Sequence, residues 1–547
     1  MPFSQQLTIM AVIMVIMSTG SSFIAFSAGA LTDPESDVLG RVDGENIWQR
    51  GMELEGIGES STAFRSAGSD GANLSASWIR DEFEAIGLES WYEEFEFFGW
   101  DLRSEPDMSI EFSNGTGNHT LVIPSFQAEQ FSSSTGEGLE GEVVLLPLPE
   151  TASYSSFQSL AFDPGFWQGI DVQGKVVLIG REVRWNRQWE GGLAEKLPEG
   201  PEALIFFYSQ SWTVALEKMF MASSGGRPHS SLGTYLEDLG IPVGHLDGED
   251  STSLVQKMSD GVVTATVRID SVQGRWNQSN VVARLPGTGS DGTVLITAHF
   301  DSIVGPGFCD NAASVGAMLE IASVIMDSKI SGNYRPRNDL VFVAFSGEEM
   351  GLVGSSFYYM EHFGELLAID GIINLDCLGA SQMVCTETSG DDLDLDSMFQ
   401  QASVDLGVEM DIGQVGSDHE SFLHPQQVMD EISRLWSDVP SMPYAPVPVA
   451  NSISVSSVPI SPQALWTSGS AGWIHTSRDS SSYANDSSWV TVTSLEEQCA
   501  VATLVAMRVA GTVEDEKSAD LLLPAMIGVG AGLLAIAAIF IWRRGKR

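Results

Sequence analysis

In the second half of the chain, short apolar runs are each followed by an acidic or imidazole side chain. His299, the pair Glu348-Glu349 and Asp376 all follow runs with the length of a buried strand. Open α/β sheets bind ligands at the carboxyl ends of their strands. We therefore expect these side chains to converge at one edge of a parallel sheet.

Five side chains in this region form a set of hard nitrogen and oxygen ligands, namely His299, Asp310, Glu349, Asp376 and His475. Two imidazoles with three carboxylates suit Zn²⁺. If two zinc ions share one of the carboxylates, each ion has three protein ligands, which is the pattern of catalytic zinc. Taken singly, these residues also fit ordinary structural roles, such as helix capping by Asp310. Together they predict a site for two zinc ions per chain.

Two further carboxylates accompany the predicted ligands. Asp301 lies two residues after His299, so in a strand both side chains share a face and Asp301 could accept the imidazole N–H. Glu348 adjoins Glu349, and one of such a pair can bind metal while the other takes a proton from activated water. The sequence therefore predicts catalytic roles for Asp301 and Glu348.

Strands and helices alternate between residues 275 and 510, which predicts an α/β catalytic domain with a mostly parallel twisted sheet and helices on both faces. Residues 45–125 are interpreted as the N-terminal part of the same domain. Residues 126–270 contain short strands between Gly-, Pro- and Ser-rich loops and predict an inserted β-rich domain. Residues 440–462, which are rich in proline, predict a long loop.

Both ends of the chain are apolar. Residues 1–30 end in an A-x-A pattern and predict a signal peptide, with an N-terminal anchor as the alternative. Residues 521–542 carry no charge and predict a transmembrane helix, and the basic residues 543–547 predict a cytoplasmic tail. The expected location is the cell membrane, with a single span and an extracellular catalytic body. Gly528 and Gly532 form a GxxxG pattern that would allow a homodimer.

Charge and cysteine content exclude some classes of protein. With 73 acidic and 27 basic residues, the formal net charge is −46, and such a surface repels nucleic acid. Four cysteines are too few for a disulfide scaffold. Cys377 and Cys385 could pair, and four free thiols fit the sequence equally well.

Residues 280–479 resemble the co-catalytic di-zinc exopeptidases of the bacterial leucyl aminopeptidase and glutamate carboxypeptidase type. The matching motifs are His299-Phe300-Asp301, Asp310-Asn311-Ala312, Ser346-Gly347-Glu348-Glu349-Met350-Gly351, Asn374-Leu375-Asp376 and His475-Thr476-Ser477-Arg478-Asp479. The resemblance implies the zinc exopeptidase fold and makes Asp310 the ligand shared by both ions. His299 and Asp376 then complete one zinc site, and Glu349 and His475 complete the other.

The resemblance implies further roles. Glu348 takes the position of the general base, and Ser417, Asp418 and His419 match a segment near the substrate pocket. The segment from Arg65 to Ser69 resembles the start of the family's domain, and the insertion resembles a protease-associated domain. Cys309 and Cys377 depart from the family pattern and would lie near metal.

These features predict a membrane-anchored extracellular zinc exopeptidase that acts on peptides. An aminopeptidase is favoured, because a free α-amine can bind near metals and carboxylates. Arg434 and Arg478 leave a carboxypeptidase open. The chain could also be a glutaminyl-cyclase-like zinc transferase or a non-catalytic receptor-like ectodomain, but the complete ligand set argues against both.

Overall fold

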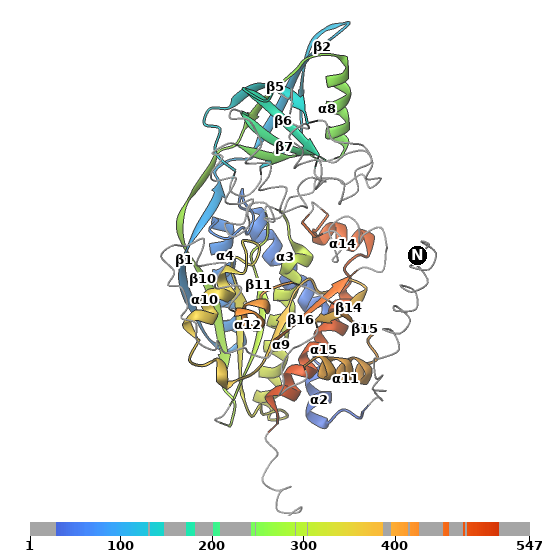
Figure 1. Ribbon diagram of the computed structural model, residues 1–547. Helices are drawn as coiled ribbons and strands as arrows, with labels where there is room; N and C mark the ends of the chain where they lie inside the picture. The colour runs from blue at the N-terminus through green and yellow to red at the C-terminus, as the bar shows by residue number, and fades with distance from the viewer. Residues whose placement is uncertain are drawn as a thin grey trace, which may run out of the picture.

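The computed structural model describes residues 29–128, 132–146, 171–180, 201–207, 242–246, 248–289, 292–303, 305–386, 395–413, 416–425, 452–458, 474–475 and 478–512. Within these residues the chain forms two eight-stranded sheets, which occupy the lower and upper parts of the molecule in Figure 1. Most of the predicted signal peptide, the predicted transmembrane helix and the basic tail lie outside the described residues. In the part that is described, one helical stretch, Phe308–Ser331, has the length and hydropathy to cross a membrane, and its apolar window is 94% buried inside the protein.

The larger sheet is mixed and has a parallel centre. Its strands are, in spatial order, β1 (Glu89–Leu102), β10 (Ser271–Leu285), β12 (Asp339–Phe345), β11 (Thr293–His299), β13 (Ile369–Leu375), β16 (Ser452–Val458), β14 (Gln382–Thr386) and β15 (Met410–Gly413). The four central strands, from β12 to β16, run parallel to one another. Antiparallel pairing begins where β10 joins β12 and where β14 joins β16. The predicted parallel arrangement therefore holds for the centre of the sheet, where the candidate ligands lie, and not for its flanks.

Helices cover both faces of this sheet. Side chains alternate between the two faces along each strand, and the strands carry apolar side chains on both. On β11, Ile296 belongs to the core beneath one face and Leu295 to the core beneath the other. The first face is covered by α2 (Asp33–Leu39), α3 (Gly44–Glu59), α4 (Asp70–Ile86), α9 (Ala313–Ser331), α11 (Leu395–Leu406) and α15 (Val492–Ala510). The second is covered by α10 (Val353–Glu361), the 3₁₀ turn η3 (Leu366–Ala368) and the short helix α12 (Glu420–Leu423).

Local sequence explains the ends of helix α4. Ser69 caps the first turn, since its hydroxyl accepts a hydrogen bond from the N–H of Ala72 at 3.1 Å. The helix stops at Gly87, whose φ of 96° lies in the left-handed region that favours glycine.

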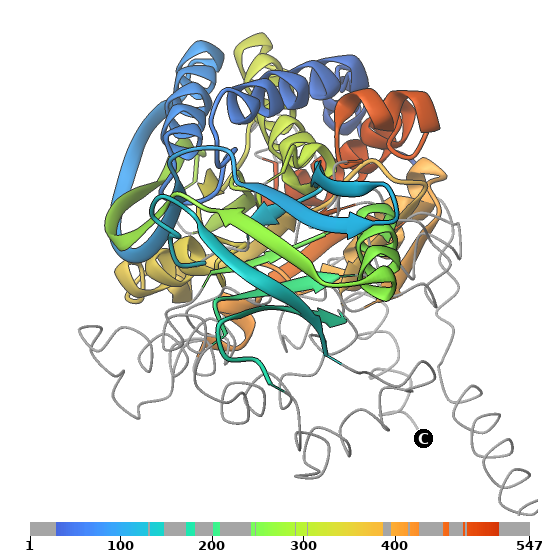
Figure 2. The same cartoon turned by 90° about the horizontal axis from the view of Figure 1, so that it is seen from above.

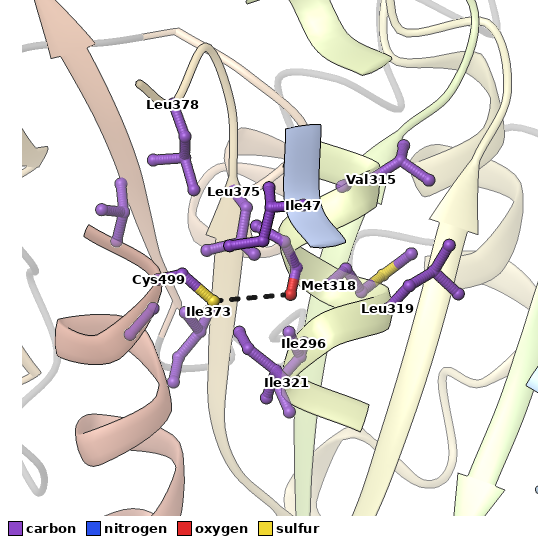
Figure 3. Packing of buried hydrophobic residues seen from close by; sticks show 14 of the residues in the cluster. Ile47, Ile296, Val315, Met318, Leu319, Ile321, Ile373, Leu375, Leu378 and Cys499 are labelled. Carbon is purple, nitrogen blue, oxygen red and sulfur yellow. Dashed lines mark hydrogen bonds between the residues drawn. The ribbon is translucent and has the colours of Figure 1, made fainter. Parts of the chain in front are cut away.

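The core between the sheet and α9 is closely packed, as Figure 3 shows for Ile296, Met318 and Ile373. Cys499 joins this core, and its thiol donates a hydrogen bond to the carbonyl of Ala317 with an S···O distance of 3.7 Å. All four cysteines are buried and free. The pairing of Cys377 with Cys385, which the sequence left open, is therefore absent.

The loop predicted over residues 440–462 contains β16, so that prediction is wrong for Ser452–Val458. Ile453 and Val455 belong to the core beneath one face of the sheet, and buried serines precede and separate them. The segment therefore has the alternation of a strand, but four of its seven residues are serine. These small side chains are buried by the close approach of neighbouring elements, and their hydroxyls find partners only in the folded protein.

The second sheet comprises β2 (Asp107–Asn114), β3 (Gly117–Val122), β4 (Gln127–Ala128), β5 (Leu139–Leu145), β6 (Lys175–Gly180), β7 (Ala203–Phe207), β8 (Val243–His245) and β9 (Val263–Arg268), with helix α8 (Gly248–Asp260). It begins at Asp107, earlier than the predicted boundary at 126, because β2 pairs with β9. The strands that lead into and out of it, β1 and β10, pair from Glu89 with Arg284 to Leu102 with Ser271. This long ribbon connects the two sheets (Figure 1).

The two sheets share one buried apolar cluster. Trp100 of β1 and Met108 of β2 belong to the same cluster as Ala67, Met350 and Val353. Viewed from above, the second sheet overlies the larger one (Figure 2). Met350 directly follows Glu349, so this apolar contact lies beside one of the predicted ligands.

Candidate metal centre

The structure brings the five predicted ligands together at the carboxyl edge of the parallel strands. His299 ends β11, Glu349 follows β12 and Asp376 follows β13. Asp310 lies in the π-helical turn η2 (Phe308–Ala312) before α9, and the peptide bond after it is cis. The fifth residue, His475, reaches the same place from the segment before α14 (Ser481–Ser487).

Asp310 is shared by two groups of three residues, each with the spacing of a metal site. In one group, Nε2 of His299 lies 3.2 Å from Oδ1 of Asp310 and 3.6 Å from Oδ1 of Asp376. In the other, Nε2 of His475 lies 2.9 Å from Oδ2 of Asp310 and 3.2 Å from Oε1 of Glu349. The two oxygens of Asp310 thus face different groups, which is the arrangement of a carboxylate that bridges two cations.

Three of the donor atoms fit a cation better than a hydrogen-bond network. Nε2 of His299, Oε1 of Glu349 and Oδ1 of Asp376 are buried and, among the described residues, have no hydrogen-bond partner. Buried polar atoms without partners are costly unless a ligand satisfies them. Groups of three imidazole nitrogens and carboxylate oxygens suit catalytic zinc, which takes water or substrate as a further ligand. The donor set therefore fits two zinc ions.

The charges of the site point the same way. Burial lowers the pKa of His299, but the carboxylates of Asp301, Asp310 and Asp376 outweigh burial and leave this pKa well above its usual value. For Asp310 burial raises the pKa, yet the two imidazoles bring it well below its usual value. Burial raises the pKa of Glu349. The carboxylates thus favour positive charge between them, and a divalent cation would supply that charge.

The turn that carries Glu348 and Glu349 is fixed by glycine and asparagine. Gly347 adopts a φ of 81°. Asn280 accepts a hydrogen bond from the N–H of Ser346 at 3.2 Å and donates one to the carbonyl of Gly354 at 2.9 Å. A Cβ atom on Gly354 would lie 2.4 Å from Oδ1 of Asn280, so only glycine allows α10 to begin this close to β12.

Asp301 is buried and holds this turn from the other side. Its Oδ1 accepts the N–H of Glu348 at 3.1 Å and its Oδ2 accepts the N–H of Glu349 at 3.2 Å. Nδ1 of His299 lies 3.1 Å from the carbonyl oxygen of Asp301 and 3.6 Å from Oδ1. The hydrogen-bond partner of the His299 imidazole is therefore the backbone carbonyl of Asp301. The carboxylate of Asp301 instead binds the backbone of Glu348 and Glu349.

Two asparagines that flank the ligands have defined contacts. Asn311 donates to the carbonyl of Leu375 at 3.0 Å and accepts from the N–H of Cys377 at 3.0 Å, so it spans Asp376. Asn374 accepts from the hydroxyl of Thr297 at 2.7 Å and donates to that of Ser417 at 2.8 Å. These amides fix the spacing of the strand ends.

Ser417, Asp418 and His419 lie between β15 and α12 and are all buried. Burial lowers the pKa of His419 to about 4, although the charge of Asp376 opposes this shift. Burial raises the pKa of Asp418 to about 7. Nδ1 of His419 is buried and has no hydrogen-bond partner among the described residues, so it is free to bond to a bound molecule.

Two residues matter more to the site than the sequence analysis indicated. Arg65 is fully buried and donates to three carbonyls of the segment that leads to Asp310. Asp479 accepts the N–H groups of Cys309 and Asp310. Both residues lie within motifs quoted from the sequence, but neither was given a role there. For Arg65, the sequence signal was a lone arginine in a Ser- and Gly-rich segment.

Comparison with known proteins finds relatives that are similar in sequence. The sequence model of peptidase family M28 matches residues 280–497. Aminopeptidase YwaD of Bacillus subtilis (strain 168) is 27% identical over 280 residues, which are 49% of this chain and 54% of that protein. The probable leucine aminopeptidase 2 of Aspergillus oryzae is 29% identical over 227 residues, or 40% of this chain and 41% of that protein. The chain thus spans about half the length of these curated relatives.

Solved structures share the fold. BSAP, a zinc aminopeptidase from Bacillus subtilis, matches with a TM-score of 0.56 at 19% identity, over 85% of this chain and 94% of that one. An aminopeptidase from Aneurinibacillus sp. strain AM-1 matches with a TM-score of 0.53 at 20% identity, over 88% and 97% of the two chains. At these identities the likeness concerns the arrangement of the elements.

Proposed function

From the match of residues 280–497 to the sequence model of peptidase family M28, together with the geometry of the metal centre, we infer that this protein is a di-zinc aminopeptidase that removes N-terminal residues from peptides. One observation carries the proposal. Asp310 presents its two oxygens to two separate groups of metal-binding side chains, and Glu348 lies next to a member of one of them. A shared ligand with an adjacent base suits hydrolysis at a two-metal site.

The residues would divide the work as follows. His299 and Asp376 would hold one ion, Glu349 and His475 would hold the other, and Asp310 would contribute to both. Zinc, when bound, supplies Lewis acidity toward the peptide carbonyl and makes water more acidic. Glu348 takes a proton from the attacking water and passes it to the leaving amine. Asp301 keeps the N–H groups of Glu348 and Glu349 in place during this transfer.

The second sheet is proposed to be a protease-associated-like domain that shapes access to this site. Its apolar cluster includes Met350, the residue after Glu349, so a shift of the sheet would reach the catalytic turn directly.

A panel of peptides tests the proposed reaction. We expect the purified protein to cleave peptides with a free N-terminus and to leave N-terminally blocked peptides intact, because an exopeptidase of this kind must hold the α-amine near metals and carboxylates. Chelation should abolish cleavage and added zinc should restore it. The measurement is product formation by mass spectrometry.

Three competing functions predict different outcomes when C-terminally blocked peptides, a peptide with N-terminal glutamine and a zinc determination are added to that panel. A carboxypeptidase would cleave N-terminally blocked peptides and fail on C-terminally blocked ones. A glutaminyl-cyclase-like transferase would release ammonia from N-terminal glutamine and contain one zinc per chain. A receptor-like ectodomain would give no product in any arm, and that result would reject an enzymatic function.

We further propose that the protein is anchored in the cell membrane with its catalytic body outside. The support is the uncharged segment 521–542 followed by the basic residues 543–547, together with the A-x-A pattern at the other end. A homodimer through Gly528 and Gly532 belongs to the same proposal.

Removal of residues 521–547 should therefore release active protein into the medium. Fractionation and activity assays of medium and membranes would measure the release, and light scattering would show whether the released body is a monomer. Release would exclude a second anchor. If the shortened chain stays on the membrane, residues 1–30 are an uncleaved anchor. If the released body is still a dimer, the dimer contact lies outside the GxxxG pattern.

A further inference from the structure

Arg65 and Asp479 lie far from each other in sequence, and both hold the backbone that carries Asp310. Arg65 precedes α4, whereas Asp479 precedes α14. Both side chains are almost completely excluded from solvent, with exposures of 0% and 1%. Neither belongs to the two groups of candidate ligands.

Arg65 binds the segment between His299 and Asp310 through carbonyl oxygens. Its Nε donates to Phe300 at 2.9 Å, its Nη1 to Pro306 at 2.8 Å and its Nη2 to Gly307 at 2.7 Å. The backbone N–H of Ser302 approaches the carbonyl of Arg65 at 3.4 Å. A planar guanidinium can serve three acceptors in fixed directions, which a lysine ammonium cannot do in the same way.

Two glycines make room for this guanidinium. A Cβ atom on Gly58 of α3 would lie 2.8 Å from Cγ of Arg65, and one on Gly307 would lie 2.9 Å from Nη2. Gly307 also has a φ of 61°, in the left-handed region. The close fit means that the segment cannot move without moving Arg65.

Asp479 binds the next part of the same segment through N–H groups. Its Oδ1 accepts the N–H of Cys309 at 2.7 Å, and its Oδ2 accepts the N–H of Asp310 at 3.2 Å. Its own carbonyl accepts the N–H of Phe308 at 3.0 Å. Each carboxylate oxygen of Asp479 therefore accepts one backbone N–H, and one of these N–H groups belongs to Asp310, the candidate bridging ligand.

We propose that Arg65 and Asp479 are positioning residues that act as a buried clamp, which holds the backbone of residues 300–310 so that Asp310 can be shared by two zinc ions. This inference rests on the proposed function only in assigning zinc to the site. Groups that orient metal ligands typically change metal affinity by about 10- to 100-fold when they are replaced.

The test is the zinc affinity of two variants of the full chain, measured by competition with a chelating dye. Asp479→Asn keeps the shape of the side chain but replaces one acceptor oxygen with a donor, so one of the two N–H groups loses its partner. Arg65→Lys keeps the positive charge but loses the fork of donors. We expect the more weakly bound zinc to lose about 10- to 100-fold in affinity in both variants.

Matched controls separate positioning from general stability. Glu320 is also buried and accepts a backbone N–H, that of Asp43 at 3.1 Å, as well as a hydrogen bond from Arg50 at 2.6 Å. Glu320→Gln and Arg50→Lys should therefore lower the melting temperature but leave zinc affinity unchanged.

Unchanged zinc affinity in folded Asp479→Asn would overturn the clamp, as would an equal loss in the two controls. If Arg65→Lys does not fold, Asp479→Asn decides, since it preserves volume. The proposed function fails separately, when the unaltered protein does not bind two zinc ions or binds them without hydrolysing peptides.

Discussion

Replacement of Glu348 by glutamine should lower the turnover number by about 10²- to 10⁴-fold and leave zinc binding intact. Glutamine has nearly the same shape but cannot accept a proton from water. Glu348 belongs to neither group of candidate ligands, and its backbone N–H, which Asp301 holds, is unaffected by the substitution. Steady-state kinetics with a free-amine peptide, together with the zinc content of the purified variant, would measure both effects.

Glu361→Gln is a suitable control for this variant, because Glu361 is the exposed last residue of α10. It makes the same chemical change on the helix that follows the catalytic turn, and its activity should match that of the unaltered protein. Full activity in Glu348→Gln would remove Glu348 from its proposed role as a base. Loss of zinc in that variant would make it a structural residue of the site.

Replacement of Asp310 by alanine should have the largest effect on the metal content. Because this carboxylate belongs to both groups, its loss leaves each ion with two protein ligands where catalytic zinc usually has three. We expect the zinc content to fall from about two ions per chain to less than about one, and hydrolysis to fall to background. Elemental analysis after dialysis, with circular dichroism to verify folding, would measure the change.

Two comparisons make this result specific. Asp376→Ala removes a ligand from one group only and should leave about one zinc per chain. Asp327→Asn, on the exposed side of the helix that begins near Asp310, should leave both ions in place. An Asp310→Ala variant that kept two tightly bound ions would show that Asp310 is not a shared ligand.

The candidate ligands and the strands that carry them could be predicted together because both are local properties of the chain. An apolar run with the length of a strand indicates where the strand ends, and parallel strands end at one edge of the sheet. His299, Glu349 and Asp376 therefore had to lie near one another once the central strands were identified.

Other features depend on partners that are distant in sequence. The serine-rich sequence of β16 is not typical of a central strand, and its place in the sheet depends on pairing with β13. The start of the second sheet at Asp107 is set by the pairing of β2 with β9. No sequence pattern could separate these segments from loops or from the preceding domain, because their hydrogen-bond partners lie elsewhere in the chain.

Residue types indicate the kind of chemistry, since they fix which atoms can bind a cation, and apolar runs indicate where those residues stand on their strands. Only the folded chain shows which oxygen of Asp310 faces which imidazole, and that Arg65 and Asp479 hold the backbone beneath it. Hydrogen bonds and metal coordination act over about 3 Å, and distances of that size between remote segments exist only after the whole chain has packed.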